Sequence, residues 1–227
     1  MVSDSTWLTS GDITIIGRIA DASNATLLAE IAGSKVVYKP VAGERPLWDF
    51  PDGNLASREY AAYHVSEMLG LGVVPRTVFR DGPYGSGIVQ EWIEEDPEID
   101  IVELAQSDSD SIRKIAFYDL LINNGDRKFG HLLAVSPDHI YAIDHGVTFN
   151  SENKLRTVLW QWAGEEFSEA ERNLLKKFLE IFESSDVNGL ITDREIEATI
   201  SRVSNLQDTD TFPYPSPDWP AVPWPPF

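Results

Sequence analysis

Short apolar runs separated by polar turns occupy the first part of the chain, and longer amphipathic segments occupy most of the rest. The short runs are rich in β-branched residues and predict antiparallel strands at 13–18, 26–31, 35–39, 73–79 and 87–93. The longer segments carry apolar residues at helical spacing and predict helices at 56–69, 111–122, 168–182 and 193–203. Apolar runs at 132–135 and 140–143 predict a further hairpin.

The order of these elements predicts an α+β protein with two lobes. We expect a small antiparallel β lobe with one helix over residues 1–93, followed by a mainly helical lobe over 94–211. The last segment, 212–227, is rich in Pro and aromatic residues, and a fully solvated tail would expose a large apolar surface. We therefore expect this segment to pack along the body of the protein.

Composition excludes several functional classes. The 18 Lys and Arg residues against 37 Asp and Glu give a net charge of −19, which repels nucleic-acid phosphates and anionic lipid headgroups. The chain has no cysteine, so disulfides, thiolate metal sites and a cysteine nucleophile are excluded. The start of the chain does not resemble a signal peptide, and no apolar run is long enough to span a membrane. We expect a cytoplasmic protein with no nucleic-acid partner and no membrane insertion.

One constellation of polar residues carries most of the candidate chemistry. Segment 123–131 reads NNGDRKFGH, and segment 143–146, after the predicted hairpin, reads IDHG. The hairpin would return Asp126 and Asp144 to the same end, as a shared metal requires. Phosphoryl transfer needs an orienting carboxylate, a cation beside the phosphoryl group and metal ligands. The alternative, loop aspartates that cap turns, explains each residue singly but not their joint spacing.

This pattern of Asp-x-Lys followed by Asp-x-Gly resembles the catalytic loop and metal-binding turn of the protein-kinase superfamily. The triplet GDR at 125–127 looks more like the loop of the phosphatidylinositol 3- and 4-kinase branch. Together with YKP at 38–40 and GERPLWDFP at 43–51, the chain is similar to an uncharacterised actinobacterial family that carries this lipid-kinase label. The charge of the chain argues against a phosphoinositide as its substrate.

The resemblance implies a two-lobed protein-kinase-like fold, ATP as a substrate and a divalent metal, Mg or Mn. It implies Asp126 and Lys128 as catalytic residues, with His131 and Asp144 as metal ligands. Kinases have a metal-binding asparagine at the place of His131, and an imidazole suits Mn or Zn better than Mg.

Lys39 and Glu59 are candidates for holding the phosphates of ATP. Lys39 ends an apolar strand, where an inward lysine is costly unless it meets a negative group. Glu59 lies one turn before Ala62 on the predicted helix and hence near its buried edge. In kinases a lysine and a glutamate pair in this way. The alternative is a surface lysine and a glutamate favoured by the helix dipole.

Two further segments complete the predicted ATP site. The first turn lacks a glycine-rich loop, but Ser23 and Asn24 offer donors that could cover phosphates; the alternative is an ordinary hairpin turn. Glu91, Trp92 and Ile93 occupy the place of the linker between kinase lobes, whose backbone would hydrogen-bond adenine. Trp92 is equally compatible with a place in the core.

These features predict an ATP- and metal-dependent kinase that phosphorylates a hydroxyl of a soluble small molecule or protein. Two other classes remain open. His131 and the missing glycine-rich loop fit a nucleotide-binding pseudokinase with a regulatory role. The Pro- and Trp-rich tail, or a turn at 184–195 that resembles an EF-hand loop, fits a protein that binds a protein partner.

Overall fold

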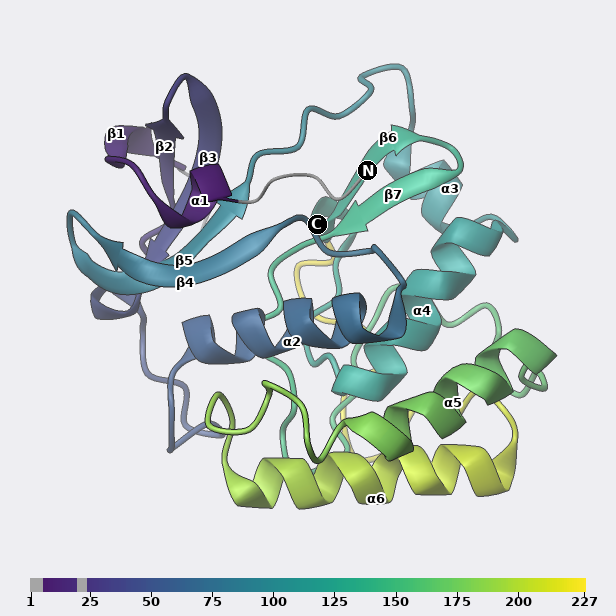
Figure 1. Ribbon diagram of the computed structural model, residues 1–227. Helices are drawn as coiled ribbons and strands as arrows, with labels where there is room; N and C mark the ends of the chain where they lie inside the picture. Colours follow the sequence, from purple (N-terminus) through teal and green to yellow (C-terminus); the bar gives the residue numbers. More distant parts are fainter. Residues whose placement is uncertain (1–5, 20–23) are drawn as a thin grey trace.

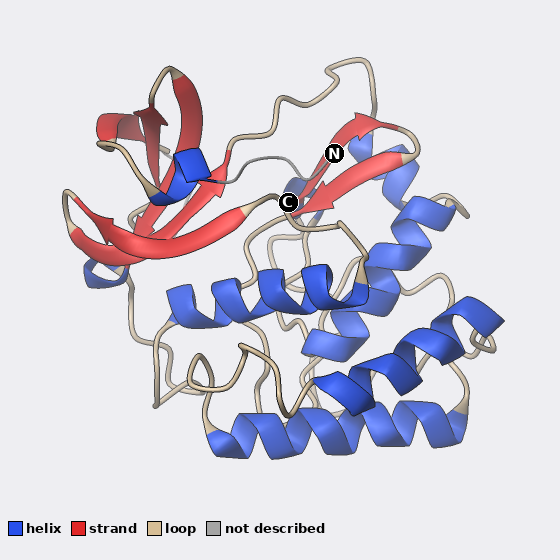
Figure 2. Ribbon diagram, in the orientation of Figure 1, coloured by secondary structure: helices blue, strands red, loops and turns tan. Residues whose placement is uncertain are grey.

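The computed structural model describes residues 6–19 and 24–227 and shows a β-sheet lobe beside a mainly helical lobe (Figures 1 and 2). The sheet is antiparallel, with the strand order β1-β2-β3-β5-β4. Its strands are β1 (Thr14–Arg18), β2 (Leu27–Ile31), β3 (Ser34–Pro40), β4 (Thr77–Gly82) and β5 (Gly85–Glu91). The short helix α1 (Thr6–Thr9) packs against β4 and β5. The predicted α+β class and the two-lobed arrangement are confirmed.

The central strand β3 explains why the sheet has two different faces. Side chains alternate along a strand, and Val36 and Tyr38 are buried in a small core with Leu8 of α1 and Val89 of β5. Lys39 lies between two buried positions of the strand and therefore points to the opposite face, where it contacts Asp144 of the second lobe. The alternation of the sequence thus directs one cation of the sheet into the cleft between the lobes.

Helix α2 (Leu55–Leu69) follows β3 and the short 3-10 helix η1 (Val41–Gly43). The Asn54 side chain accepts a hydrogen bond from the Ser57 amide at 2.7 Å and so caps the first turn. The helix ends at Gly70, which adopts a left-handed conformation with φ of 71° that glycine tolerates without strain.

The second lobe contains the remaining helices and a two-stranded hairpin. The helices are α3 (Ile101–Ala105), α4 (Asp110–Ile122), η2 (Phe129–His131), α5 (Glu169–Ile181) and α6 (Asp193–Thr209), and the hairpin strands are β6 (Leu132–Ser136) and β7 (His139–Ala142). Helices α5 and α6 lie side by side at the end of the molecule opposite the sheet (Figure 1). Each begins with a capping box, at Ser168 and Thr192.

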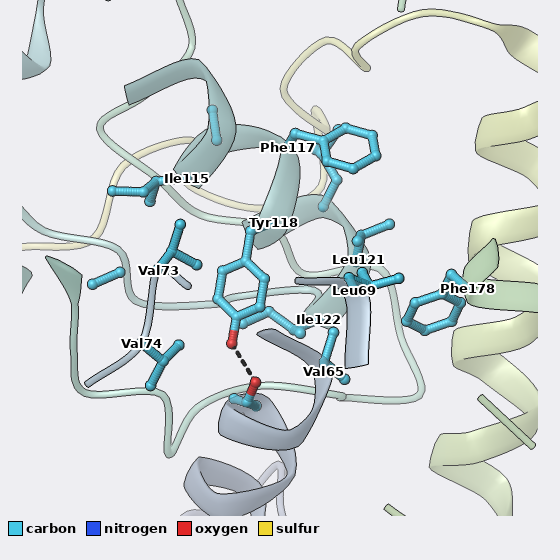
Figure 3. Packing of buried hydrophobic residues seen from close by; sticks show 14 of the residues in the cluster. Val65, Leu69, Val73, Val74, Ile115, Phe117, Tyr118, Leu121, Ile122 and Phe178 are labelled. Carbon is cyan, nitrogen blue, oxygen red and sulfur yellow. Dashed lines mark hydrogen bonds between the residues drawn. The ribbon is translucent and has the colours of Figure 1, made fainter. Parts of the chain in front are cut away.

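The larger hydrophobic core joins α2 to the helical lobe. Figure 3 shows Val65 and Leu69 of α2 packed near Tyr118 and Leu121 of α4, with Phe178 of α5 beside them. The Tyr118 hydroxyl donates a hydrogen bond to the Ala62 carbonyl at 2.7 Å. The core therefore crosses the boundary expected at residue 93, and it fixes α2 relative to the helix that leads into segment 123–131.

Several predicted boundaries were wrong. Strand β4 begins at Thr77 rather than at 73, because Val73 and Val74 are buried in the larger core and the Val73 carbonyl accepts a hydrogen bond from the Ala142 amide at 2.7 Å. Strand β5 ends at Glu91, so Trp92 leaves the sheet. Helix α6 continues to Thr209 instead of ending at 203. The short helix α3 was not predicted within the acidic segment that surrounds it.

Residues 212–227 lie against the helical lobe through backbone contacts. The Ala221 carbonyl accepts hydrogen bonds from the Thr157 amide at 3.0 Å and from Trp160 Nε1 at 2.9 Å. The Pro226 carbonyl accepts one from the amide of Phe129 at 2.9 Å. Trp224 still exposes 85% of its surface, so this tail is held in place without burying all its aromatic residues. Across residues 6–19 and 24–227, no helix combines the length and apolar character needed to cross a membrane.

Candidate active site

Lys39 lies between two carboxylates that come from different lobes. Its ammonium nitrogen is 2.7 Å from Glu59 Oε1 on α2 and 3.1 Å from Asp144 Oδ1, which follows β7. Burial alone would lower the pKa of Lys39, but the charges of Asp144 and Glu59 outweigh it and raise this pKa. The positive charge of Lys39 in turn holds the pKa of Asp144 well below its usual range. Lys39 and Asp144 are therefore charged at neutral pH. Burial raises the pKa of Glu59, and the charge of Lys39 opposes this shift. The three side chains join the two lobes.

Asp144 occupies a tight turn and remains accessible. Its backbone has a φ of 61°, a left-handed conformation that Asp adopts more readily than most residues. The Ile143 amide donates to the His131 carbonyl at 3.0 Å, which ties the turn to segment 123–131. The Asp144 side chain is 53% exposed although it pairs with Lys39, so a ligand can reach its second oxygen.

His131 faces that second oxygen, with Nε2 at 3.5 Å from Asp144 Oδ2. Two ligands about 2.1 Å from one metal lie roughly 3 to 3.5 Å apart, so this separation fits a shared ion. Burial lowers the pKa of His131, which favours the neutral imidazole that binds metals. Within the described ranges, no group of three or more His, Cys, Asp or Glu side chains could hold a metal. Water or phosphate oxygens would have to complete the coordination.

Asp126 and Lys128 lie next to this cluster on the same loop. Lys128 Nζ is 3.3 Å from Asp126 Oδ2, and both side chains are largely buried. The Asp126 amide donates to Asn124 Oδ1 at 3.0 Å, which shapes the backbone around the carboxylate. Asp126 also lines the pocket that contains Lys39 and Asp144.

This pocket has a volume of about 220 Å³ and lies between the two lobes. It brings together five of the predicted site residues, which are Asn24, Lys39, Glu59, Asp126 and Asp144. Asn24 contributes through its side-chain oxygen, which accepts a hydrogen bond from the Arg45 amide at 2.9 Å. Ser23 lies outside the described residues.

The segment predicted to contact adenine does not line this pocket. The Glu91 carboxylate pairs with Arg76, with Nε to Oε2 at 2.9 Å, and the Trp92 amide donates to the Lys35 carbonyl at 3.3 Å. These contacts hold 91–92 against β3 and β4 and use the Trp92 amide. Ile93 follows immediately, outside the sheet.

Sequence reasoning missed the residues that hold the loop in place. Arg127 is fully buried, and its guanidinium donates to both oxygens of Asp119 on α4, each at 2.9 Å. Arg127 also donates to the Ile143 carbonyl at 3.0 Å and to His145 Nε2 at 2.7 Å. One arginine thus connects α4, the loop and the turn at Asp144. The signal in the sequence was Asp119, an acidic residue among the apolar residues of a predicted helix.

The turn that resembles an EF-hand loop has a structural role in this protein. Glu195, at its last ligand position, forms the capping box of α6 with Thr192. It also forms a buried ion pair with Arg58 of α2, with Nη2 to Oε1 at 2.7 Å. This carboxylate is therefore already engaged.

Comparison with known proteins supports this view of the fold. No model of a protein family matches the sequence. Two crystal structures of the Golgi casein kinase are similar in fold, with TM-scores of 0.55 and 0.53, and both share 15% identity, covering 88% of this chain and 73% of that kinase. The first of them contains Mn and ADP.

A relative with higher sequence similarity comes from an actinobacterium. Protein Rv2133c of Mycobacterium tuberculosis (strain ATCC 25618 / H37Rv) is 38% identical over an alignment of 262 positions, gaps included, and the alignment covers 97% of this chain and 94% of that protein. The similarity therefore extends over almost the entire chain and includes both lobes. The chain has a protein-kinase-like fold and belongs to the same family as the mycobacterial protein Rv2133c.

Proposed function

We propose that this protein is an ATP- and divalent-metal-dependent phosphotransferase that acts on a hydroxyl group. The observation that carries the proposal is the position of Lys39, which contacts Glu59 and Asp144 at 2.7 and 3.1 Å and lines one pocket with Asp126. A cation in this position can bind nucleotide phosphates, and Asp144 would hold a divalent metal that offsets their charge. The Mn and ADP in the similar Golgi casein kinase are consistent with such ligands.

Each remaining polar residue has a role in this proposal. Asp126 orients or deprotonates the acceptor hydroxyl, and Lys128 stabilises the charge on the transferring phosphoryl group. His131 contributes a neutral imidazole to the metal, which favours Mn over Mg. Asn24 covers the phosphates, and the backbone at Ile93 contacts adenine, since the Trp92 amide is already used.

The acceptor is best sought among soluble molecules. In the triplet GDR, which resembles lipid kinases, Arg127 is fully buried and bonded to Asp119, so it anchors the loop and does not contact a substrate. The net charge of −19 opposes an anionic membrane surface. We therefore propose a small-molecule or protein hydroxyl as acceptor rather than a phosphoinositide.

A second candidate is a pseudokinase that binds nucleotide without turnover. The ion pair of Lys128 with Asp126 at 3.3 Å favours it, because this contact occupies the carboxylate that would otherwise orient an acceptor. Nucleotide binding with no phosphate release and no labelling of any acceptor would support this second role.

The proposal is tested by thermal melting with ATP or ADP, each alone and with Mg or Mn. A ligand at a hundred times its dissociation constant adds about 2.7 kcal/mol of stability, which gives a readable shift. We expect a metal-dependent shift in the wild type and none in Asp144→Ala. The matched control is Asp138→Ala, in the exposed turn between β6 and β7, which should keep the full shift. An equal shift in wild type and Asp144→Ala would remove Asp144 from the metal site.

A further inference from the structure

A second cavity lies away from the proposed nucleotide pocket. It has a volume of about 640 Å³, is partly open to solvent, and lies between α6, the start of segment 123–131 and the tail. Apolar side chains from α4, from α6, from the segment after residue 150 and from the tail line it. They include Leu120, Leu155, Trp160, Leu206, Pro213 and Trp219. A cavity of this size and character suits a small ligand with a substantial apolar body.

Arg202 of α6 is the one arginine or lysine that lines this cavity. Its Nε donates to Asn153 Oδ1 and its Nη2 to the Asn150 carbonyl, both at 2.7 Å, and Nη1 lies 3.5 Å from the Thr199 hydroxyl. All three acceptors are uncharged. In the part of the chain that the structure describes, no carboxylate forms an ion pair with Arg202.

The absence of a negative partner has an electrostatic consequence. Burial lowers the pKa of Arg202 to about 10, with no neighbouring carboxylate to oppose this effect. The guanidinium is still charged at neutral pH, so a positive charge is held in a place poorly solvated by water. Such a charge gains more from a bound anion than an exposed arginine does, because water screens it less.

Two carboxylates at the rim do not supply this partner. Glu152 is exposed, so solvent screens it, and its carboxylate lies 3.2 Å from Lys154, which also pairs with Asp49. Asp218 is on the exposed surface of the tail, where solvent screens it. Arg202 is thus the charge within the cavity that most needs an ion of opposite sign.

We propose that this cavity binds an amphipathic anion: a carboxylate, sulfonate or phosphate group on an apolar body. The acidic group contacts Arg202 and the amide of Asn205, and the apolar body packs against Leu155, Leu206 and Trp219. This proposal does not rest on nucleotide binding or on the proposed phosphotransfer.

The cavity also reaches the start of the catalytic loop. Asn123, at the end of α4, lines it and donates to the Asn150 carbonyl at 2.9 Å. The same carbonyl accepts the hydrogen bond from Arg202. Arg202 and Asn123, the residue at which the loop begins, therefore share one hydrogen-bond acceptor. A ligand on Arg202 would lie close to the start of the loop.

The test compares two fluorescent probes that differ chiefly in charge, anilinonaphthalene sulfonate and the uncharged phenylnaphthylamine. Each is titrated into the full chain as wild type, Arg202→Gln and Arg194→Gln. We expect Arg202→Gln to weaken sulfonate binding about tenfold or more and to change binding of the neutral probe less than about twofold. Arg194 is exposed on the same helix but outside the cavity, so Arg194→Gln makes the same charge change and should leave both affinities unaltered.

Two further variants guard against misfolding and against binding elsewhere. Arg202→Lys keeps the charge and should recover much of the sulfonate affinity, which a merely structural loss would not do. Asn205→Trp, on the exposed side of α6, fills the cavity and should weaken both probes. The proposal is overturned if Arg202→Gln and Arg194→Gln weaken the sulfonate equally, if Arg202→Lys binds no better than Arg202→Gln, or if Asn205→Trp binds both probes like the wild type.

Discussion

Arg127 and Arg202 are both largely removed from water, yet their charges are balanced in opposite ways. Arg127 is fully buried and bonds to both oxygens of Asp119, to backbone carbonyls and to His145. Among residues 6–19 and 24–227, Arg202 bonds only to uncharged acceptors, and it faces a cavity. A buried charge with a complete set of partners holds structure together, whereas one without a counter-ion is a candidate binding group.

The same distinction applies within the proposed nucleotide pocket. Lys39 has two carboxylate partners, but Asp144 keeps an accessible oxygen that Lys39 does not use. The network there is complete enough to position its members and open enough to take a ligand. The predictions below alter one side of this comparison at a time, from the largest expected effect to the smallest.

Replacing Arg127, whose charge is balanced by Asp119, should lower the free energy of unfolding more than any other change described below. Arg127→Met leaves the fully buried Asp119 carboxylate without its ion-pair partner and with the hydrogen bond from the Asn124 side chain, and breaking a buried pair in this way typically costs about 3–5 kcal/mol. Urea denaturation at neutral pH measures the change. Arg172→Met is the matched control, because it breaks an ion pair with Asp210 whose side chains are 39% and 41% exposed. Equal losses in the two variants would show that burial of the Arg127 pair is unimportant.

Removing one partner of Lys39 should affect ligand binding next most strongly. Glu59→Gln keeps a hydrogen-bond acceptor at 2.7 Å but removes a buried charge, so Lys39 is held less firmly against nucleotide phosphates. We expect ATP affinity to fall about tenfold to a hundredfold in titration calorimetry, equivalent to about 1.4–2.8 kcal/mol. Glu67→Gln, on an exposed position of the same helix, should leave affinity unchanged. If Glu59→Gln bound ATP as tightly as the wild type, the role given to the Lys39–Glu59 pair would be contradicted.

His64 extends the comparison to a group that titrates near neutral pH. Its ring packs 4.4 Å from that of Tyr60, and burial lowers the pKa of His64. The unfolded chain therefore binds a proton more readily, and stability from this residue is full above about pH 6.5 and is lost as the pH falls through the lower folded pKa. The melting temperature of His64→Gln should therefore fall less than that of the wild type as the pH drops below about 6.5. His139→Gln, at the exposed start of β7, is the control, and identical pH profiles for wild type and His64→Gln would oppose this assignment.

Replacing Arg202, which has no carboxylate partner among the described residues, should change the free energy of unfolding the least. Arg202→Met removes a charge that has no counter-ion, and the Asn150 carbonyl keeps its hydrogen bond from Asn123. The free energy of unfolding should change by less than about 1 kcal/mol in urea. A loss as large as that of Arg127→Met would mean that Arg202 supports the fold and would weaken the contrast between the two sites.

The local pattern was sufficient to predict most elements and the residues of the central cluster. The alternation in β3 predicted an inward Lys39, and the helical spacing placed Glu59 near a buried edge, where it is 3% exposed. The hairpin between Asp126 and Asp144 follows from short apolar runs around a polar turn. The boundaries failed where packing between lobes replaced sheet pairing, as at Val73 and Val74.

The sequence by itself determined the fold class, the loop and the order of its charged residues, because strand alternation, helix periodicity and turn residues act over a few neighbouring positions. Only the tertiary structure decided which charges are compensated. Asp119 and Arg127, Glu59 and Lys39, and Arg58 and Glu195 are brought together by packing of separate elements. Coulomb interactions depend on distance in space and on burial, neither of which is written in the local sequence. The unpaired state of Arg202 is a property of the folded chain for the same reason.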